Sequence, residues 1–317
     1  MWDYRDPREY LERVRKGMPP LIISVAITGG VHGKEANENL PEQPEEQARQ
    51  TYDAYRAGAS LVHVHAREPN TGYADPSSNP EDFYQINKRI RDACPDMIIN
   101  NTTGGGLGLT MEERVRSLEA KPEMASLNCG PLPLKMLFKA RKPPLSGRDQ
   151  DVLRDTLIPI TFGETEYFAR SMKERGIKPE LEVYHPGQYW LVDNLIEQKL
   201  LDPPYIIQFV MGFQHGIYPT PQNLLTMIDG LPKESIFEVI GIGHSQLSMN
   251  VMGILLGGHV RTGMEDNVYF RRGERCKGNG QLVERVVRIA QELGRPVATP
   301  KEARRMLGIS DVPSQYP

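Results

Sequence analysis

Two histidines separated by a single residue, His63 and His65, lie in the strand-like segment 61–67. Alternate side chains of an extended strand share one face, so both imidazoles point the same way and lie close enough to bind one ion. The opposite face carries Val62 and Val64, whose apolar side chains suit burial against helices. The His-x-His pattern alone is equally typical of two buried, hydrogen-bonded histidines, so a metal site requires a further ligand.

Charged residues that could complete such a site occur in another strand-like segment, 259–266. By the same alternation, Arg261, Gly263 and Glu265 share one face, and Asp266 follows directly. Two histidines and one carboxylate with an open coordination position form a catalytic zinc site, and the same ligands bind non-haem iron. The residue types therefore predict a metal site without choosing the metal.

Polar residues also occupy the predicted inward faces of other segments. They are Ser126 and Asn128 in segment 123–130, and Glu180, Glu182 and Tyr184 in segment 179–187. The turn at 101–106 and the Gly-Ile-Gly-His stretch at 241–244 offer hydroxyl or backbone N–H groups that could hold an anion. Burying unpaired charges costs several kcal/mol each, so a ligand site explains these residues better than a structural network does.

Strand-like and helix-like segments alternate along almost the whole chain. The eight strand-like segments are 20–30, 61–67, 97–105, 123–130, 179–187, 204–212, 236–243 and 259–266. The helical patterns are 44–58, 80–94, 110–120, 162–176, 188–200, 220–232, 244–258 and 281–294, with a short last helix from about Thr299. Alternating strands and helices predict a parallel sheet, and eight such units predict an α/β fold, the TIM (β/α)8 barrel.

We predict one domain over residues 1–317, with the barrel core at about 20–295, an N-terminal arm and a C-terminal extension. The main alternative, a doubly wound open sheet, requires Gly-x-Gly-x-x-Gly after the first strand, whereas that strand ends Thr-Gly-Gly-Val. Segment 131–160 shows no regular pattern. In a closed barrel the second and eighth strands both flank the first, so Glu265 can approach the two histidines.

Composition excludes several classes of protein. The chain has 38 Lys and Arg residues against 41 Asp and Glu, a net charge of −3, which argues against a nucleic-acid binder. No apolar stretch reaches the roughly 20 residues that span a bilayer, and the N-terminus lacks a signal-peptide core. Three cysteines without a Cys-x-x-Cys pattern fit a reducing compartment. We therefore expect a cytoplasmic protein without nucleic-acid or membrane partners.

Ordered blocks of the sequence resemble the β-keto acid cleavage enzyme family from about Pro20 to Ile309. The blocks are ITGG (27–30), NLP with PEEQA (39–48), AGASLVHVHARE (57–68), NTTGG (101–105), KPEMASLN (121–128), PELEVY (179–184), GIG (241–243), GGHVRTGMEDN (257–267), QLVERVVRIAQELGRP (281–296) and ATPKEAR (298–304). The resemblance implies a zinc-dependent TIM-barrel acyltransferase that converts a β-keto acid and acetyl-CoA into acetoacetate and a new acyl-CoA. It also suggests a homotetramer, with segment 131–160 as a candidate for subunit contacts.

The same resemblance implies the roles of individual residues. Zinc, bound by His63, His65 and Glu265, would polarise the substrate ketone, and Asp266 would remove the α-proton. The resulting enolate would attack the acetyl-CoA thioester, and a retro-Claisen step would release the products. Arg261 would orient Asp266 and stabilise developing negative charge. The further residues expected to act are Glu182, in support of the base, and Thr102, Gly104, Ser126, Asn128, Val31 and His32, in substrate binding.

One position departs from a family member that acts on a 5-amino acid. In that member a glutamate after the first strand pairs with the substrate ammonium, whereas this chain has Val31 there. Valine cannot pair with a cation, so we predict a preference for neutral or apolar β-keto acids. A carboxylate from Glu35 or Glu38 would reverse this prediction, and His32 could instead favour a polar or anionic tail.

Two other functions fit the same residues. A metal-dependent aldolase or lyase could use the two histidines and the carboxylate without coenzyme A, and dependence of product formation on acetyl-CoA separates it from the first function. A non-catalytic metabolite-binding barrel would have no need for a base beside a metal, so Asp266 and Arg261 argue against it.

Overall fold

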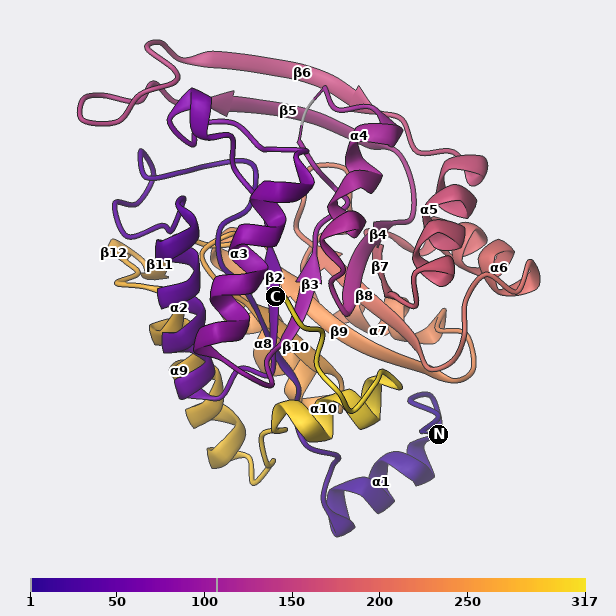
Figure 1. Ribbon diagram of the computed structural model, residues 1–317. Coiled ribbons are helices and arrows are strands. Elements are labelled where there is room, and N and C mark those ends of the chain that lie inside the picture. Colours follow the sequence, from indigo (N-terminus) through magenta and orange to yellow (C-terminus); the bar gives the residue numbers. More distant parts are fainter. Residues whose placement is uncertain (1, 107) are drawn as a thin grey trace.

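The computed structural model describes residues 2–106 and 108–317 and contains a closed parallel barrel (Figure 1). The barrel strands, in chain order, are β1 (Ile23–Ala26), β2 (Leu61–Val64), β3 (Ile98–Asn101), β4 (Met124–Asn128), β7 (Lys178–Val183), β8 (Tyr205–Met211), β9 (Ser235–Gly241) and β10 (His259–Thr262). Their order around the barrel is β1-β10-β9-β8-β7-β4-β3-β2. Each predicted strand segment overlaps one of these strands, so the predicted TIM barrel is confirmed.

Helices follow the barrel strands, and several of them begin at start signals in the sequence. They are α2 (Pro44–Ala57), α3 (Pro80–Ala93), α4 (Met111–Val115), α5 (Phe162–Glu174), α6 (Tyr189–Glu197), α7 (Pro221–Asp229), α8 (Gln246–Leu255), α9 (Asn279–Glu292) and α10 (Pro300–Leu307). Proline occupies the first turn of α2, α3, α7 and α10, where its missing N–H removes no helical bond. Thr110, Thr161 and Thr299 form capping boxes with a glutamate three residues later.

The two ends of the barrel are different. At the amino ends of the strands, α10 packs Ala303 and Leu307 against Leu61, Ile98 and Met124, which closes this end. A further N-terminal helix, α1 (Pro7–Lys16), lies at the same end in Figure 1. The carboxyl ends of the strands therefore remain to form a ligand site. Among the described residues, no helix is long and apolar enough to cross a bilayer.

An antiparallel hairpin of β5 (Leu132–Phe138) and β6 (Val152–Ile158) crosses the carboxyl end of the barrel (Figure 1). The sequence predicted no regular element in 131–160. Alternation is present in β5, where Leu132 and Leu134 are buried and the residues between are exposed. A strand with one buried face is recognised in a sequence by the alternation of apolar and polar residues. Here exposed Leu137 and the leucines on the outer face of β6 hide that alternation, because they place apolar residues on the outer face as well.

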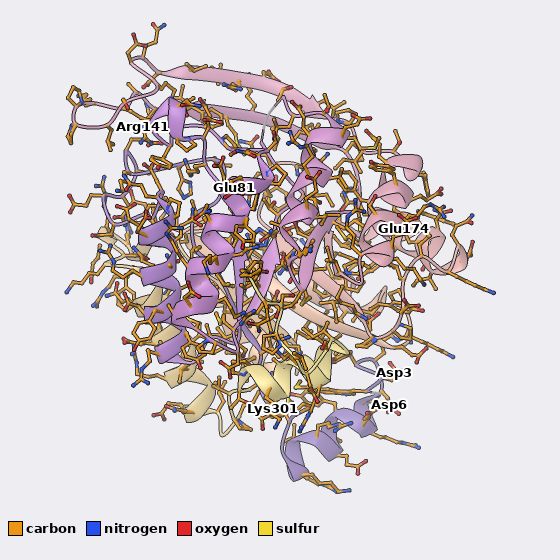
Figure 2. The ribbon with its side chains drawn as sticks, viewed as in Figure 1. Asp3, Asp6, Glu81, Arg141, Glu174 and Lys301 are labelled. Atoms are coloured by element: carbon orange, nitrogen blue, oxygen red, sulfur yellow. The ribbon has the colours of Figure 1, made fainter. Side chains whose placement is uncertain are left out.

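The turn of this hairpin is bound to the loop that follows β1. Arg141, labelled in Figure 2, belongs to this turn. It forms two parallel hydrogen bonds to Glu42, Nη1 to Oε1 at 2.7 Å and Nη2 to Oε2 at 2.8 Å. Its Nη1 also donates to Glu35 at 2.8 Å, and Arg148 reaches the other Glu35 oxygen at 3.2 Å. Bidentate, buried pairs of this kind hold a defined geometry, so the hairpin and the loop form one cover over the barrel.

The eighth strand is shorter than predicted. β10 ends at Thr262, and Glu265 and Asp266 lie on the turn that follows, so their assignment to the strand was wrong. Gly263 has a φ of +139°, and a Cβ there would lie 2.1 Å from the carbonyl oxygen of Ala26. Only glycine fits this close approach. The chain leaves the barrel wall here and presents both carboxylates from a turn.

Candidate active site

A cavity of about 470 Å³ lies between the carboxyl ends of the barrel strands and the β5–β6 hairpin. Its polar wall comprises His63, His65, Thr102, Asn128, Glu182, Tyr184, Arg261, Glu265 and Asp266. Its apolar wall comprises Leu132, Leu134, Met136, Phe138, Ile158, Val210, Ile240 and Ile242. Most residues predicted for catalysis therefore gather in one place, and an apolar wall that the sequence did not predict faces them.

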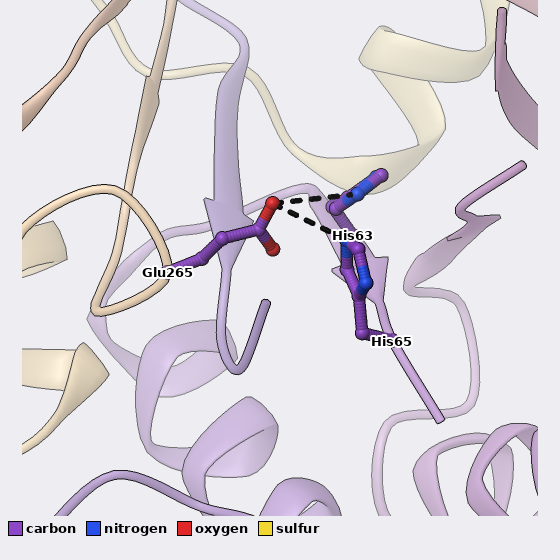
Figure 3. Close-up of side chains that lie close together, drawn as sticks. All are labelled: His63, His65 and Glu265. Atoms are coloured by element: carbon purple, nitrogen blue, oxygen red, sulfur yellow. Dashed lines mark ion pairs between the residues drawn. The ribbon is translucent and has the colours of Figure 1, made fainter. Parts of the chain in front are cut away.

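His63, His65 and Glu265 form a cluster suited to one metal ion (Figure 3). Glu265 Oε1 lies 3.3 Å from His65 Nε2 and 3.8 Å from His63 Nε2. One candidate ligand atom from each residue lies within 4.8 Å of the other two. The second Glu265 oxygen, Oε2, is buried and has no hydrogen-bond partner among the described residues. Two imidazoles and a carboxylate with a free oxygen fit a divalent cation such as zinc.

The protonation of these groups also favours metal binding. Burial lowers the pKa of His63 to about 3, although Glu265 opposes the shift. Burial alone would raise the pKa of Glu265, but Arg261 and the two histidines hold it well below its usual value. A neutral imidazole and an ionised carboxylate are the forms that bind metals.

Asn100 on β3 orients His63 from behind. His63 Nδ1 lies 3.3 Å from Asn100 Oδ1, and Asn100 Nδ2 donates to Glu180 Oε2 at 2.8 Å. The amide is held with its oxygen towards the imidazole, so Nδ1 carries the proton and Nε2 is left to bind a metal. A hydrogen bond of this kind from the second nitrogen of a ligating histidine fixes the ring and its tautomer. Sequence patterns missed Asn100, because nothing local pairs it with a histidine on the neighbouring strand.

Replacing Asn100 by leucine is expected to weaken zinc binding about tenfold, since His63 loses the partner that fixes its ring. The affinity is measured by competition with a chromophoric chelator. The matched control is Asn101→Leu, the next residue of β3, whose Nδ2 donates to Ser117 O on the helix side at 3.0 Å. The control should lower stability without changing zinc affinity. Equal loss of zinc affinity in both variants would mean that Asn100 acts only through the fold.

Arg261 on β10 holds both carboxylates of the following turn. It donates to Asp266 through Nε and Nη2, each at 2.9 Å, and to Glu265 Oε1 through Nη2 at 2.6 Å. Gly243, after β9, donates its backbone N–H to Asp266 O at 2.8 Å, so this glycine motif anchors the turn. Burial raises the pKa of Asp266 to about 6, against the lowering effect of Arg261. Asp266 is thus a stronger base than an exposed aspartate, and still ionised at neutral pH.

Glu182 on β7 and Tyr184, the residue directly after this strand, complete the polar wall. Tyr184 donates to Asn128 Oδ1 at 2.9 Å, and its hydroxyl lies 3.4 Å from Glu182 Oε2. Arg261 Nη1 lies 3.7 Å from Glu182 and has no hydrogen bond, and Asn128 Nδ2 is also buried without a partner among the described residues. Both residues line the cavity, and their unpaired donors are candidates for the oxygen atoms of a ligand.

The hydrogen-bonding groups of the turn after β3 have more partners within the protein than the sequence suggested. Thr102 and Gly104 both line the cavity, but the Gly104 N–H already donates to Thr102 Oγ1 at 3.0 Å. Ser126 is buried, does not line the cavity, and accepts from the Thr103 N–H at 3.3 Å. Of the hydroxyl-bearing residues predicted to bind substrate, Thr102 therefore lines the cavity, whereas Ser126 supports the turn.

The loop after β1 places Val31 and His32 on the cavity wall. Val31 is 42% exposed, and His32 Nε2 lies 2.9 Å from Met264 O, a bond that fixes the ring. Glu35 is taken up by Arg141 and Arg148 and does not line the cavity, nor does the exposed Glu38. No carboxylate of this loop therefore takes the place of the glutamate that the family member has at the position of Val31.

Comparison with known proteins identifies relatives over nearly the whole chain. The family model described as beta-keto acid cleavage enzyme matches residues 20–309, which confirms the resemblance found in the sequence. A 3-keto-5-aminohexanoate cleavage enzyme from Acetoanaerobium sticklandii is 42% identical over 293 residues, covering 92% of this chain and 100% of that protein. A 3-oxoadipate:acetyl-CoA acetyltransferase from Cupriavidus necator is 33% identical, covering 92% of this chain and 95% of that protein. The apo structure of ObcA shares the fold, with a TM-score of 0.66 and 18% identity over 86% of this chain and 66% of ObcA.

Proposed function

The chain belongs to the β-keto acid cleavage enzyme family, and we propose that it is a zinc-dependent acyltransferase. In this proposal it converts a β-keto acid and acetyl-CoA into acetoacetate and a new acyl-CoA. Two relatives support it by name, one as a 3-keto-5-aminohexanoate cleavage enzyme and one as a 3-oxoadipate:acetyl-CoA acetyltransferase. The observation that carries the proposal is the His63, His65 and Glu265 cluster with Asp266 directly beside it. A site that only binds a metabolite has no use for a buried base next to a set of metal-binding side chains.

The polar residues around the His63, His65 and Glu265 cluster have defined tasks in this reaction. Zinc, when bound, supplies a Lewis acid that polarises the substrate ketone. Asp266 removes the proton from the carbon between ketone and carboxylate, and Arg261 keeps Asp266 in place. The free donors of Arg261 and Asn128 hold substrate oxygen atoms, where negative charge is present or develops. Glu182, whose pKa burial raises, supports this group through Arg261 and Tyr184.

The carbon skeleton is exchanged in two steps. The deprotonated α-carbon attacks the thioester carbonyl of acetyl-CoA, forming a carbon–carbon bond and releasing the coenzyme A thiolate. The thiolate then attacks the former ketone carbon, and the bond between that carbon and the α-carbon breaks. The α-carbon recovers its proton from Asp266, so the products are acetoacetate and the acyl-CoA of the remaining fragment.

The test is the formation of acetoacetate by zinc-loaded protein from a β-keto acid panel, with and without acetyl-CoA. The proposal expects acetoacetate and the new thioester to form in equal amounts, only when both substrates are present. Cleavage without acetyl-CoA would establish the aldolase or lyase instead. Absence of turnover across the panel would favour the binding barrel.

Because of Val31, we expect this protein not to prefer 5-amino substrates, although a relative at 42% identity is named for one. The wild type should turn over neutral or apolar β-keto acids best. Val31→Glu should raise kcat/KM for the 5-amino acid about tenfold relative to its uncharged analogue, since a carboxylate then faces the ammonium. Val14→Glu on α1, similarly exposed and remote from the cavity, is the control. A wild type most active on the 5-amino acid would refute this role of Val31.

The proposal also covers the oligomeric state of the protein and its location in the cell. We infer a homo-oligomer, a tetramer in the family resemblance, for which the exposed outer face of the hairpin with Leu137, Leu153 and Leu157 offers an apolar contact surface. A cytoplasmic location is supported by three buried cysteines without disulfides, Cys94, Cys129 and Cys276.

A further inference from the structure

The inner face of the β5–β6 hairpin forms a track that leads away from the reactive groups. The antiparallel register pairs Leu132 with Ile158, Leu134 with Thr156, Met136 with Arg154, and Phe138 with Val152 on this face. Leu132 lies four residues after Asn128 of the polar wall, and Phe138 ends the strand. Six residues of strand span about 20 Å. The cavity lining includes both ends of this track.

The far end of the track carries an uncompensated positive charge. Four of the six cationic side chains in 132–158 have a carboxylate partner in the hairpin or the β1 loop. Arg154 has neither an ion pair nor a side-chain hydrogen bond among the described residues. Its guanidinium carbon lies 5.5 Å from the Phe138 ring centroid, and that of Arg148 lies 5.4 Å from the same ring. An aromatic ring and a free guanidinium thus meet where the track reaches solvent.

We propose that this track binds acetyl-CoA, with the pantetheine arm along the apolar face and the phosphate-bearing adenosine end at Phe138 and Arg154. The inference rests on the proposed function, because it locates the second substrate of that reaction. A short β-keto acid held by the polar wall does not reach Phe138. A ligand that does must be long, have one reactive end and carry negative charge at the other.

The chemistry of each part of coenzyme A matches its part of the track. The thioester lies beside Asn128 and Asp266, where the deprotonated substrate attacks. The arm, largely apolar with amide groups, covers Leu132, Leu134 and Met136. The phosphates meet Arg154, because guanidinium groups bind phosphate oxygens through paired hydrogen bonds, and the adenosine lies next to Phe138.

The experiment compares acetyl-CoA with S-acetylpantetheine, a thioester that lacks the phosphates and the adenosine, as second substrates of the zinc-loaded enzyme. In Arg154→Ala, KM for acetyl-CoA should rise about tenfold. The preference for acetyl-CoA over S-acetylpantetheine should fall by the same factor. The control is Arg175→Ala, which removes the same charge just before β7, at the opposite end of the barrel.

The outcomes separate the binding track from the reaction itself. An unchanged preference between the two thioesters in Arg154→Ala would overturn the proposal, as would an equal rise in KM for both. If the wild type turns over neither thioester, the proposed function fails. In that case, calorimetric titration with coenzyme A tests whether the track binds it. The proposal expects Arg154→Ala to bind coenzyme A about tenfold more weakly than Arg175→Ala does, and equal binding would overturn it.

Discussion

Replacing Asp266 by asparagine is expected to lower kcat about 1000-fold without changing the zinc content, because a general base contributes about 100- to 10,000-fold. Asparagine keeps the size of the side chain and one acceptor for Arg261, but it cannot take a proton. The zinc ligands stay in place, since Asp266 contacts the cluster only through Arg261. Initial rates of acetoacetate formation and zinc analysis of the same sample give both quantities.

The matched control for this variant is Asp311→Asn, which alters an exposed aspartate 3.8 Å from Arg305. The control should retain full activity. Turnover at the wild-type rate in zinc-loaded Asp266→Asn would contradict the assignment of the base. A variant that loses zinc along with activity would show that Asp266 belongs to the metal site and has no separate catalytic task.

Removing the metal is expected to abolish turnover, and adding zinc back should restore it, because the ketone is then no longer polarised. Glu265→Gln and His65→Ala should each weaken zinc binding at least about 100-fold, a larger loss than that expected for Asn100, which only supports a ligand. Chelator competition measures the affinity, and elemental analysis measures the stoichiometry.

His244→Ala is the control for the ligand variants. His244 is an exposed histidine that follows β9 at the same end of the barrel, and it does not line the cavity. Its loss should leave zinc binding unchanged. Full activity of metal-free wild type, or unchanged zinc affinity in Glu265→Gln, would be incompatible with the proposed metal site.

Local periodicity explains why so much of the barrel could be predicted. Each barrel strand buries both faces, and turn and capping residues mark its limits, so the segments are recognisable one at a time. The face shared by His63 and His65 follows from the two-residue period of a strand and needs no tertiary information. Arg261 on β10 follows from the same rule.

The same rule was misleading where the chain leaves the barrel. Alternation was extended through Gly263 to Glu265, although the strand ends at Thr262 and the glycine turns the chain at the Ala26 carbonyl. Ser126 has the predicted inward parity, but it is hydrogen-bonded to Thr103 and does not line the cavity. Alternation along a strand predicts the face on which a side chain lies, but it does not predict which other residues contact that side chain.

The sequence by itself determined the eight strand–helix units, the shared face of His63 and His65, and the family, because all of these depend on order and spacing along the chain. The tertiary structure decided how close Glu265 comes to the histidines, that Asn100 supports His63, and that the hairpin supplies an apolar wall. These features join residues distant in sequence. Their positions follow from barrel closure and from the Arg141–Glu42 pair, and no local pattern encodes either.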